Sequence, residues 1–321
     1  MSVAEIMARA CRRRILVPAF NIAYLPMMAP IVQTLREHDT FALVEVSQPD
    51  IEYFGAESYQ AVATAFERCA ERRVVRLHQD HVCVIDERGQ RTDWQTRIQL
   101  ALALGYDSVM LDGSRLPLAE NIAATKTVVG MAHPAVAVEG ELGAVLGHEH
   151  SPLPPHEEIM AAGYGFTDPG DVERFVRETG VDWLSVAAGN IHGAVAGVAR
   201  DEEKVGTRLD LDHIQRLSEC AKIPFVLHGG TGIDLDCVRQ AAAYSMTKVN
   251  VGTAVRQPYE AALRRGESET EAQRAVAEAV ARCIAEYDIA GSASRLASDT
   301  GLVTLPPRTG PGERNLEEQG R

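Results

Sequence analysis

Short runs of apolar and β-branched residues recur along this chain, and segments with helical character separate them. Eight runs read as β-strands: residues 17–22, 41–47, 74–81, 108–114, 135–143, 183–189, 225–230 and 247–253. Strands that alternate with helices favour a parallel sheet, because a parallel pair needs a crossover long enough to hold a helix. Eight such strands predict an α/β fold, the (β/α)8 TIM barrel.

Helical signals fill the intervals between these runs. Three segments are the clearest: residues 118–132, 170–180 and 268–287. Asp171 is a candidate N-cap of the second, and Ser268 with Glu271 forms a capping-box pattern at the start of the third. The alternative fold, a doubly wound open sheet, usually carries an early Gly-x-Gly-x-x-Gly, which is missing from this sequence. The closed barrel is therefore favoured.

The remaining sequence indicates one domain. We expect the barrel to span residues 1–296 and a flexible tail, rich in proline, glycine and charge, to span 297–321; residues 83–95 read as a polar surface excursion. The formal net charge of −13 argues against nucleic acid and anionic lipid as partners. Six cysteines without a Cys-x-x-Cys pair, and no apolar run of bilayer length, predict a cytoplasmic protein without a membrane anchor.

Three histidines stand at or just beyond the ends of predicted strands: His81, His192 and His228. The carboxyl ends of barrel strands meet at one rim, so the three imidazoles can converge on one divalent cation and leave a coordination position open. A lone histidine is more often a core or surface residue, but three at strand ends reverse that expectation. Neutral imidazoles suit zinc, so the sequence predicts a zinc site.

Acidic residues near these histidines are candidates for proton transfer. Asp80 directly precedes His81, and Glu149 lies in a segment whose glycine and prolines suggest a movable flap. For Glu149, a solvated loop charge is an equally good interpretation of the sequence.

Two glycine-containing turns follow the last two predicted strands. His228-Gly229-Gly230-Thr231-Gly232 and Asn250-Val251-Gly252-Thr253 each precede a predicted helix, where backbone N–H groups favour a phosphate. Tight turns are the simpler interpretation of either motif alone. Together, on neighbouring strands where barrels often hold phosphate, they predict a phosphate site.

Six motifs occur in order along the chain: Asp80-His81, VMLDGSRLP at 109–117, VEGELG at 138–143, GNIHG at 189–193, HGGTG at 228–232 and KVNV at 248–251. With this set, from Val17 to Ala293, the chain resembles the class II, zinc-dependent ketose-bisphosphate aldolases, which include fructose-bisphosphate and tagatose-bisphosphate aldolases. A chance match of the whole ordered set is implausible.

The resemblance implies a role for each matching residue. His81, His192 and His228 would hold one catalytic Zn²⁺ per subunit, and Asp112 with Glu141 would mark a second metal position. Asn250 would contact the enediolate of dihydroxyacetone phosphate, Glu149 would move the substrate proton, and Asp80 would protonate the aldehyde oxygen. The residues expected to bind the substrate and its phosphate, with Na⁺ or K⁺ nearby, are Asn21, Ser47, Gly193, Gly229, Thr231, Gly252 and Thr253.

The implied activity is aldol cleavage or condensation of a sugar phosphate in carbohydrate metabolism such as glycolysis, by a homo-dimer or homo-tetramer. Four departures from the family pattern touch neighbouring or substrate-facing positions and leave the aldehyde undetermined: Ala23-Tyr24, Val82, Gly252 and a longer polar excursion from Cys83. Two alternatives remain: a non-catalytic relative that binds a sugar phosphate, and a metal-dependent barrel hydrolase. Retention of Asp80 and Glu149 disfavours the first, and the phosphate turns disfavour the second.

Overall fold

The computed structural model describes residues 1–86, 88–143, 155–190, 208–230 and 232–298. Within these residues, parallel strands close into a barrel in chain order, with β8 pairing back onto β1. The strands are β1 (Val17–Asn21), β2 (Ala42–Val46), β3 (Val75–Cys83), β4 (Ser108–Asp112), β5 (Ala137–Leu142), β6 (Trp183–Val186), β7 (Phe225–Leu227) and β8 (Met246–Val251). The predicted (β/α)8 barrel is confirmed, and each strand lies within two residues of its predicted run or inside it.

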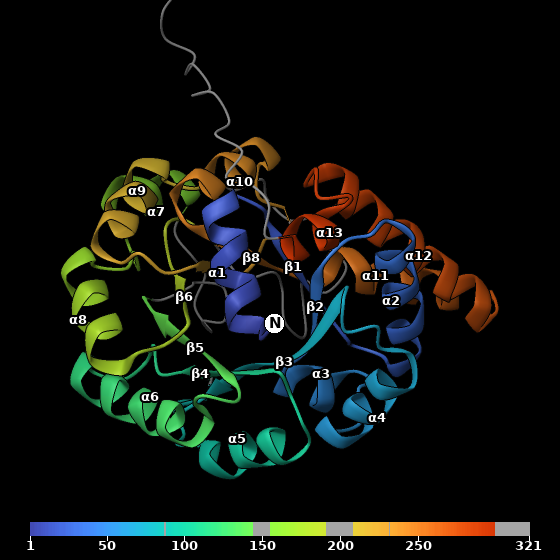
Figure 1. Cartoon of the computed structure of the whole chain (residues 1–321), viewed down its shortest axis with the longest axis horizontal. Helices are drawn as coiled ribbons and strands as arrows, with labels where there is room; N and C mark the ends of the chain where they lie inside the picture. Colours follow the sequence, from blue (N-terminus) through green and yellow to red (C-terminus); the bar gives the residue numbers. More distant parts are fainter. Residues whose placement is uncertain (87, 144–154, 191–207, 231, 299–321) are drawn as a thin grey trace, which may run out of the picture.

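Helices form a ring outside the strands (Figure 1). They are α2 (Met28–Glu37), α3 (Gln48–Tyr53), α4 (Tyr59–Cys69), α5 (Trp94–Ala103), α6 (Leu118–Ala132), α7 (His156–Ala162), α8 (Pro169–Thr179), α9 (Leu211–Cys220), α10 (Leu235–Ala241), α11 (Thr253–Arg264), α12 (Glu269–Glu286) and α13 (Ser292–Ala297). Their apolar faces pack on the outside of the barrel wall and form one hydrophobic core with it.

Local capping explains where two of the predicted helices begin. Ser268 and Glu271 form the expected capping box of α12. For α8 the predicted N-cap is wrong: the side chain of Asp168 accepts the backbone N–H of Asp171, and Pro169 follows the cap. Proline suits this first position because its missing N–H would have no partner inside the helix.

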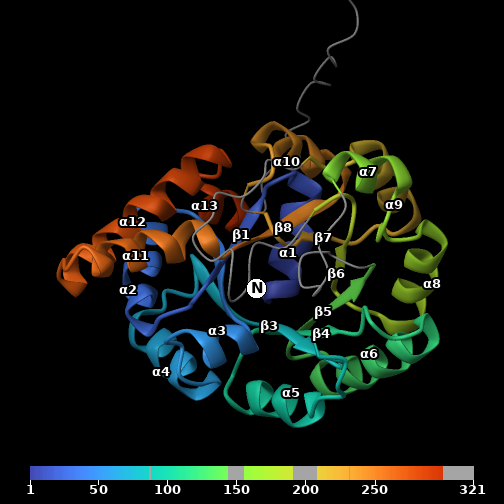
Figure 2. The same cartoon turned by 180° about the vertical axis from the view of Figure 1, so that it is seen from behind.

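One end of the barrel is closed by α1 (Val3–Arg13), which lies across it, in front of the strands in Figure 1 and behind them in Figure 2. This helix leads into β1 and therefore covers the amino ends of the strands. It buries Val3, Ile6, Met7 and Ala10. The opposite rim, where the strands end, is left to carry a site.

Two peripheral segments were expected from the sequence. Within residues 83–95, Cys83 ends β3, Trp94 begins α5, and Ile85 and Arg91 between them form an antiparallel bridge. The expected tail starts at Ala297, the last residue of α13, and residues 299–321 lie outside the described part of the chain. Among the described helices, none has the length and apolar character needed to cross a membrane.

Candidate metal centre and catalytic site

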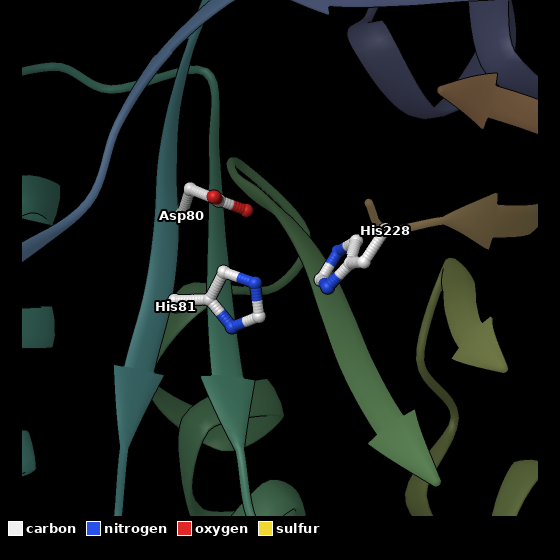
Figure 3. A group of neighbouring side chains, drawn as sticks. All are labelled: Asp80, His81 and His228. Carbon is white, nitrogen blue, oxygen red and sulfur yellow. The ribbon is translucent and has the colours of Figure 1, made fainter. Parts of the chain in front are cut away.

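Strand β3 directs two consecutive side chains into the barrel, although successive residues of a regular strand point to opposite faces. The pairing of β3 with β4 shifts register between Gln79 and Val82. Asp80 and His81 lie in this β-bulge, and His81 has a φ of 44°, in the left-handed region. Both side chains consequently face His228, which comes from the end of β7 (Figure 3).

The rings of His81 and His228 lie beside each other, with centroids 4.3 Å apart. Nδ1 of His81 is 3.7 Å and Nδ1 of His228 is 3.8 Å from the same oxygen, Oε2 of Glu141. That oxygen is buried and accepts no hydrogen bond from the described residues. Two imidazole nitrogens near an unsatisfied carboxylate oxygen match the donor set of a divalent cation such as zinc, so the residues present fit a metal ion.

Asp112, the other expected second-position ligand, lies beside His81, with Oδ2 3.9 Å from Nδ1. Its Oδ1 accepts the backbone N–H and the hydroxyl of Ser114, and the thiol of Cys83 lies 3.2 Å from Oδ2. Burial opposes ionisation, but His81 and Ser114 outweigh it and hold the pKa of Asp112 well below its usual range. Asp112 is therefore an ionised neighbour of the candidate centre.

The structure places His81, His228, Asp112 and Glu141, four of the residues expected to bind metal, close to one another. The third expected ligand, His192, lies outside the described residues, as do Glu149, Gly193 and Thr231. The segment after β6, which leads toward His192, is tied to His228, because Nδ2 of Asn190 donates to the backbone oxygen of His228 over 3.2 Å.

Glu139 fixes which nitrogen of His228 faces the centre. Its Oε1 lies 3.0 Å from Nε2 of His228. A carboxylate accepts hydrogen bonds, so we assign the ring proton to Nε2, which leaves the lone pair of Nδ1 on the side of His81 and Glu141. Glu139 was not among the predicted site residues.

The two histidines differ in charge. Burial and the neighbouring His81 lower the pKa of His228 to about 4, so it is neutral at pH 7. Burial also acts to lower the pKa of His81, but the carboxylates of Asp80, Asp112 and Glu141 outweigh it and raise that pKa to about 10. Without a cation, His81 is thus the positively charged partner of the carboxylates around it.

Asp80 and Asn250, two of the residues expected to take part in catalysis, are hydrogen-bonded to each other. Nδ2 of Asn250 donates to Oδ1 of Asp80 over 3.1 Å, and both side chains are almost fully buried. Burial acts to raise the pKa of Asp80, but the positive charges of His81 and Lys248 lower it overall. Asp80 is therefore ionised next to the candidate metal ligands.

The candidate phosphate turns occupy the neighbouring strand ends. Gly229 follows β7 with a φ of 67°, a conformation that favours glycine, and Thr253 begins α11 directly after Gly252. The N-terminus of this twelve-residue helix therefore faces the rim that holds the histidines.

Two other predicted substrate residues contact a common carboxylate. Asp50 accepts Nδ2 of Asn21 over 3.1 Å and the hydroxyl of Ser47 over 2.7 Å. Ser47 and Asp50 also form the capping box that begins α3. The structure thus joins Asn21 and Ser47 at the rim through an acid that the sequence analysis did not identify.

A polar cluster below the rim was not among the predicted site residues. It consists of Glu45, His78, Glu139 and Lys248, all fully buried. The sequence held a signal for it: His78 is two residues from Asp80, Glu139 from Glu141 and Lys248 from Asn250. In a strand this spacing puts both members of each pair on one face, so the inward face of an apolar-looking strand can be polar.

Comparisons with known proteins identify the family of this chain. Residues 1–295 match the family model described as fructose-bisphosphate aldolase class-II. The chain is 30% identical over 258 residues to the fructose-bisphosphate aldolase of Geobacillus stearothermophilus, covering 79% of this chain and 80% of that protein. It is 32% identical over 256 residues to the 6-phospho-5-dehydro-2-deoxy-D-gluconate aldolase of Bacillus licheniformis, covering 79% of each.

Solved structures share the fold. The YdjI aldolase of Escherichia coli K12 superposes with a TM-score of 0.71 at 23% identity, covering 91% of this chain and 98% of that one. A putative fructose-1,6-bisphosphate aldolase from Coccidioides immitis gives a TM-score of 0.71 at 24% identity, over 90% and 97% of the two chains. From the full-length family match and the curated relatives, the chain belongs to the class II fructose-bisphosphate aldolase family.

Proposed function

We propose that this protein is a zinc-dependent aldolase that cleaves or forms a ketose phosphate through the enediolate of dihydroxyacetone phosphate. The observation that carries the proposal is the convergence of His81, His228 and Glu141 at the rim beside Asp80. We extend it to a barrel domain of residues 1–296 with a tail of 297–321, acting as a cytoplasmic homo-dimer or homo-tetramer.

The candidate metal ligands are His81, His192 and His228, with Asp112 and Glu141 at a second position. When bound, Zn²⁺ would supply Lewis-acid stabilisation of negative charge on the substrate oxygens. Glu139 accepts a hydrogen bond from the protonated Nε2 of His228, which directs Nδ1 toward the candidate metal position.

Two acidic residues of the chain each carry out one proton transfer. Glu149 removes the C3 proton of dihydroxyacetone phosphate, and Asp80 carries the proton of the aldehyde oxygen. In the cleavage direction Asp80 acts as a base, for which its lowered pKa and its hydrogen bond from Asn250 prepare it. Asn250 donates to Asp80 through its amide and would contact the enediolate.

Substrate binding is assigned to the rim between β1, β2, β7 and β8. The phosphate would be held by Gly193, Gly229, Thr231, Gly252 and Thr253, with a monovalent cation nearby; Asn21 and Ser47 line the side toward Asp50. The helix N-terminus at Thr253 favours an anion there despite the overall net charge of −13. The two curated relatives are named for different substrates, so the aldehyde is a separate question.

The test is hydrogen exchange into dihydroxyacetone phosphate alone, in heavy water, followed by NMR. Zinc-loaded protein should exchange the C3 proton, and a chelator should stop it. Glu149→Ala should abolish exchange and keep zinc, whereas His192→Ala should lose the metal. If zinc-loaded wild-type protein binds dihydroxyacetone phosphate without exchange, the non-catalytic sugar-phosphate binder is supported instead.

A panel of aldehydes that differ in length and charge then identifies the partner of the enediolate. The expected result is metal-dependent formation of a new carbon–carbon bond with at least one aldehyde of the panel. Hydrolysis of a phosphate or amide substrate without this condensation would favour the barrel hydrolase.

A further inference from the structure

Lys248 crosses the barrel interior to reach carboxylates on three other strands. Its Nζ is 2.9 Å from Oε2 of Glu139 on β5 and 3.1 Å from Oε2 of Glu45 on β2. It is also 3.7 Å from Oδ1 of Asp80 on β3. The lysine side chain is fully buried, and so are Glu45 and Glu139. A single ammonium group thus joins β8 to three strands that do not neighbour it in the barrel.

Such an interior is unusual for this fold. TIM-barrel interiors are mostly filled by layers of branched apolar side chains, and an ion pair in such a place is seldom better for stability than an apolar replacement of similar volume. A fully buried lysine with several carboxylates therefore needs another explanation. Its connections to the site supply one.

The first connection leads from Lys248 to the metal ligand His228. Oε2 of Glu139 accepts a hydrogen bond from Nζ of Lys248 and, over 2.6 Å, a second one from Nε1 of Trp183. With Oε2 held on that side, Oε1 is directed to Nε2 of His228 at 3.0 Å. Lys248 and Trp183 together orient the carboxylate that orients the imidazole.

The second connection leads from Lys248 to Asp80. Lys248 and Asn250 are two residues apart on β8, so their side chains leave the strand on the same face. Asn250 donates to Oδ1 of Asp80, and Nζ of Lys248 lies near the same oxygen. The carboxylate of Asp80 therefore lies near two side chains of β8, the neutral amide of Asn250 and the charged ammonium of Lys248.

We propose that Lys248 is a positioning residue, which sets the orientations of Glu139 and Asp80 and through them those of the metal ligand His228 and of proton transfer. The proposal rests on the function proposed above. An alternative role for a buried barrel lysine is a Schiff-base nucleophile, which needs a neutral amine. The three carboxylates around Lys248 keep its ammonium charged, since they outweigh the effect of burial and raise its pKa.

The test is a double-mutant cycle between Lys248→Met and Glu139→Gln, with the affinity of the metal-free protein for Zn²⁺ as the readout. Competition against a chromophoric chelator measures it without any turnover. Each single variant should weaken zinc binding by about 10–100-fold, the range for loss of a group that supports a metal ligand. Because both changes act through the same contact to His228, the double variant should be little weaker than either single variant.

Catalysis supplies an independent readout through Asp80. In Lys248→Met saturated with zinc, kcat for condensation should fall by at least about tenfold, while KM for dihydroxyacetone phosphate stays within about twofold. This split is expected because Lys248 reaches Glu45, Asp80 and Glu139, which lie outside the phosphate turns. An equal effect on kcat and KM would indicate general distortion of the site and overturn the proposal.

A matched control is Thr40→Val, which removes a fully buried hydroxyl whose partners are the backbone oxygens of His38 and Ile289, away from the site. It should leave zinc affinity unchanged. Wild-type zinc affinity in Lys248→Met, or additive effects in the cycle, would overturn the proposal. If Lys248→Met does not fold, the zinc affinity of Glu139→Gln is the test. An affinity equal to that of the wild type would overturn the proposal.

The failure of the proposed function is distinguishable from the failure of this proposal. If zinc-loaded wild-type protein does not exchange the C3 proton, the aldolase assignment fails, whatever the zinc affinities are. If wild-type protein does exchange and the cycle is additive, the aldolase assignment stands and the positioning role of Lys248 fails.

Discussion

At the scale of single residues, the candidate centre separates charge between two similar side chains. His228 is neutral because it is buried and lies beside a second histidine, and its Nε2 faces Glu139. His81 keeps a proton in the metal-free protein because three carboxylates outweigh burial. A cation that binds here replaces a proton among the same carboxylates, so metal binding and protonation compete.

This competition predicts that zinc uptake releases protons. At pH 7 to 8 the pKa of His81, about 10, lies above the solution pH, so binding should release at least about one proton per ion, with a contribution from Glu141, whose pKa is raised by burial and by Asp112. Affinity should therefore fall as the pH falls. Calorimetry in two buffers of different ionisation enthalpy measures the number of protons. Zinc binding with no proton release at pH 7 would contradict these charge states.

At the scale of elements, α8 packs closely against β5 at a glycine. Gly140 lies in the middle of β5, where a Cβ atom would meet Cε1 of Phe175, on α8, at 2.7 Å. The missing side chain lets α8 pack onto the strand that carries Glu139 and Glu141 inward. By contrast, Gly130 lies on the exposed side of α6, and a Cβ atom there would meet nothing within 4 Å.

The two glycines therefore predict opposite effects of the same substitution. Gly140→Ala should lower the free energy of unfolding by about 1–3 kcal/mol, since it forces extra volume into a packed contact. Gly130→Ala should raise it by about 0.5–1 kcal/mol, since alanine restricts the unfolded chain and favours the helix. Urea denaturation of the two variants and the wild type measures both values. A stabilising Gly140→Ala would show that α8 can move away from β5 without cost.

At the scale of the whole molecule, the barrel gathers residues that are far apart in sequence. His81 on β3, Glu141 on β5 and His228 directly after β7 form one group, although β4 and β6 separate these three strands within the barrel. A ligand that joins them cross-links the native barrel only. It should stabilise the folded state, because the unfolded chain lacks the convergent site.

Metal removal is therefore predicted to lower the Tm. Free zinc at about 1,000 times its Kd adds about 4 kcal/mol to the free energy of unfolding, a shift on the order of 5–10 °C for a chain of this size. His228→Ala should be insensitive to a chelator. Differential scanning calorimetry with and without chelator measures the difference. Equal Tm values for wild-type protein in the two conditions would show that zinc does not bind at this centre under those conditions.

Much of the fold followed from local patterns. The order of apolar runs and helical segments predicted the closed barrel, because each strand is a short local signal and the topology of consecutive parallel strands leaves few alternatives. The predicted N-cap of α8 was wrong because the helix begins earlier, at Pro169, and the residue before it, Asp168, caps it.

The sequence by itself determined which residues stand at the strand ends, and with them the group of His81, His228, Asp112 and Glu141. Tertiary structure decided the rest. That His81 points inward beside Asp80 depends on the β3 bulge, a register shift against another strand. That Lys248 joins Glu45, Glu139 and Asp80 depends on distances across the barrel. Contacts of this kind form between strands remote in sequence, so no local pattern of residues encodes them.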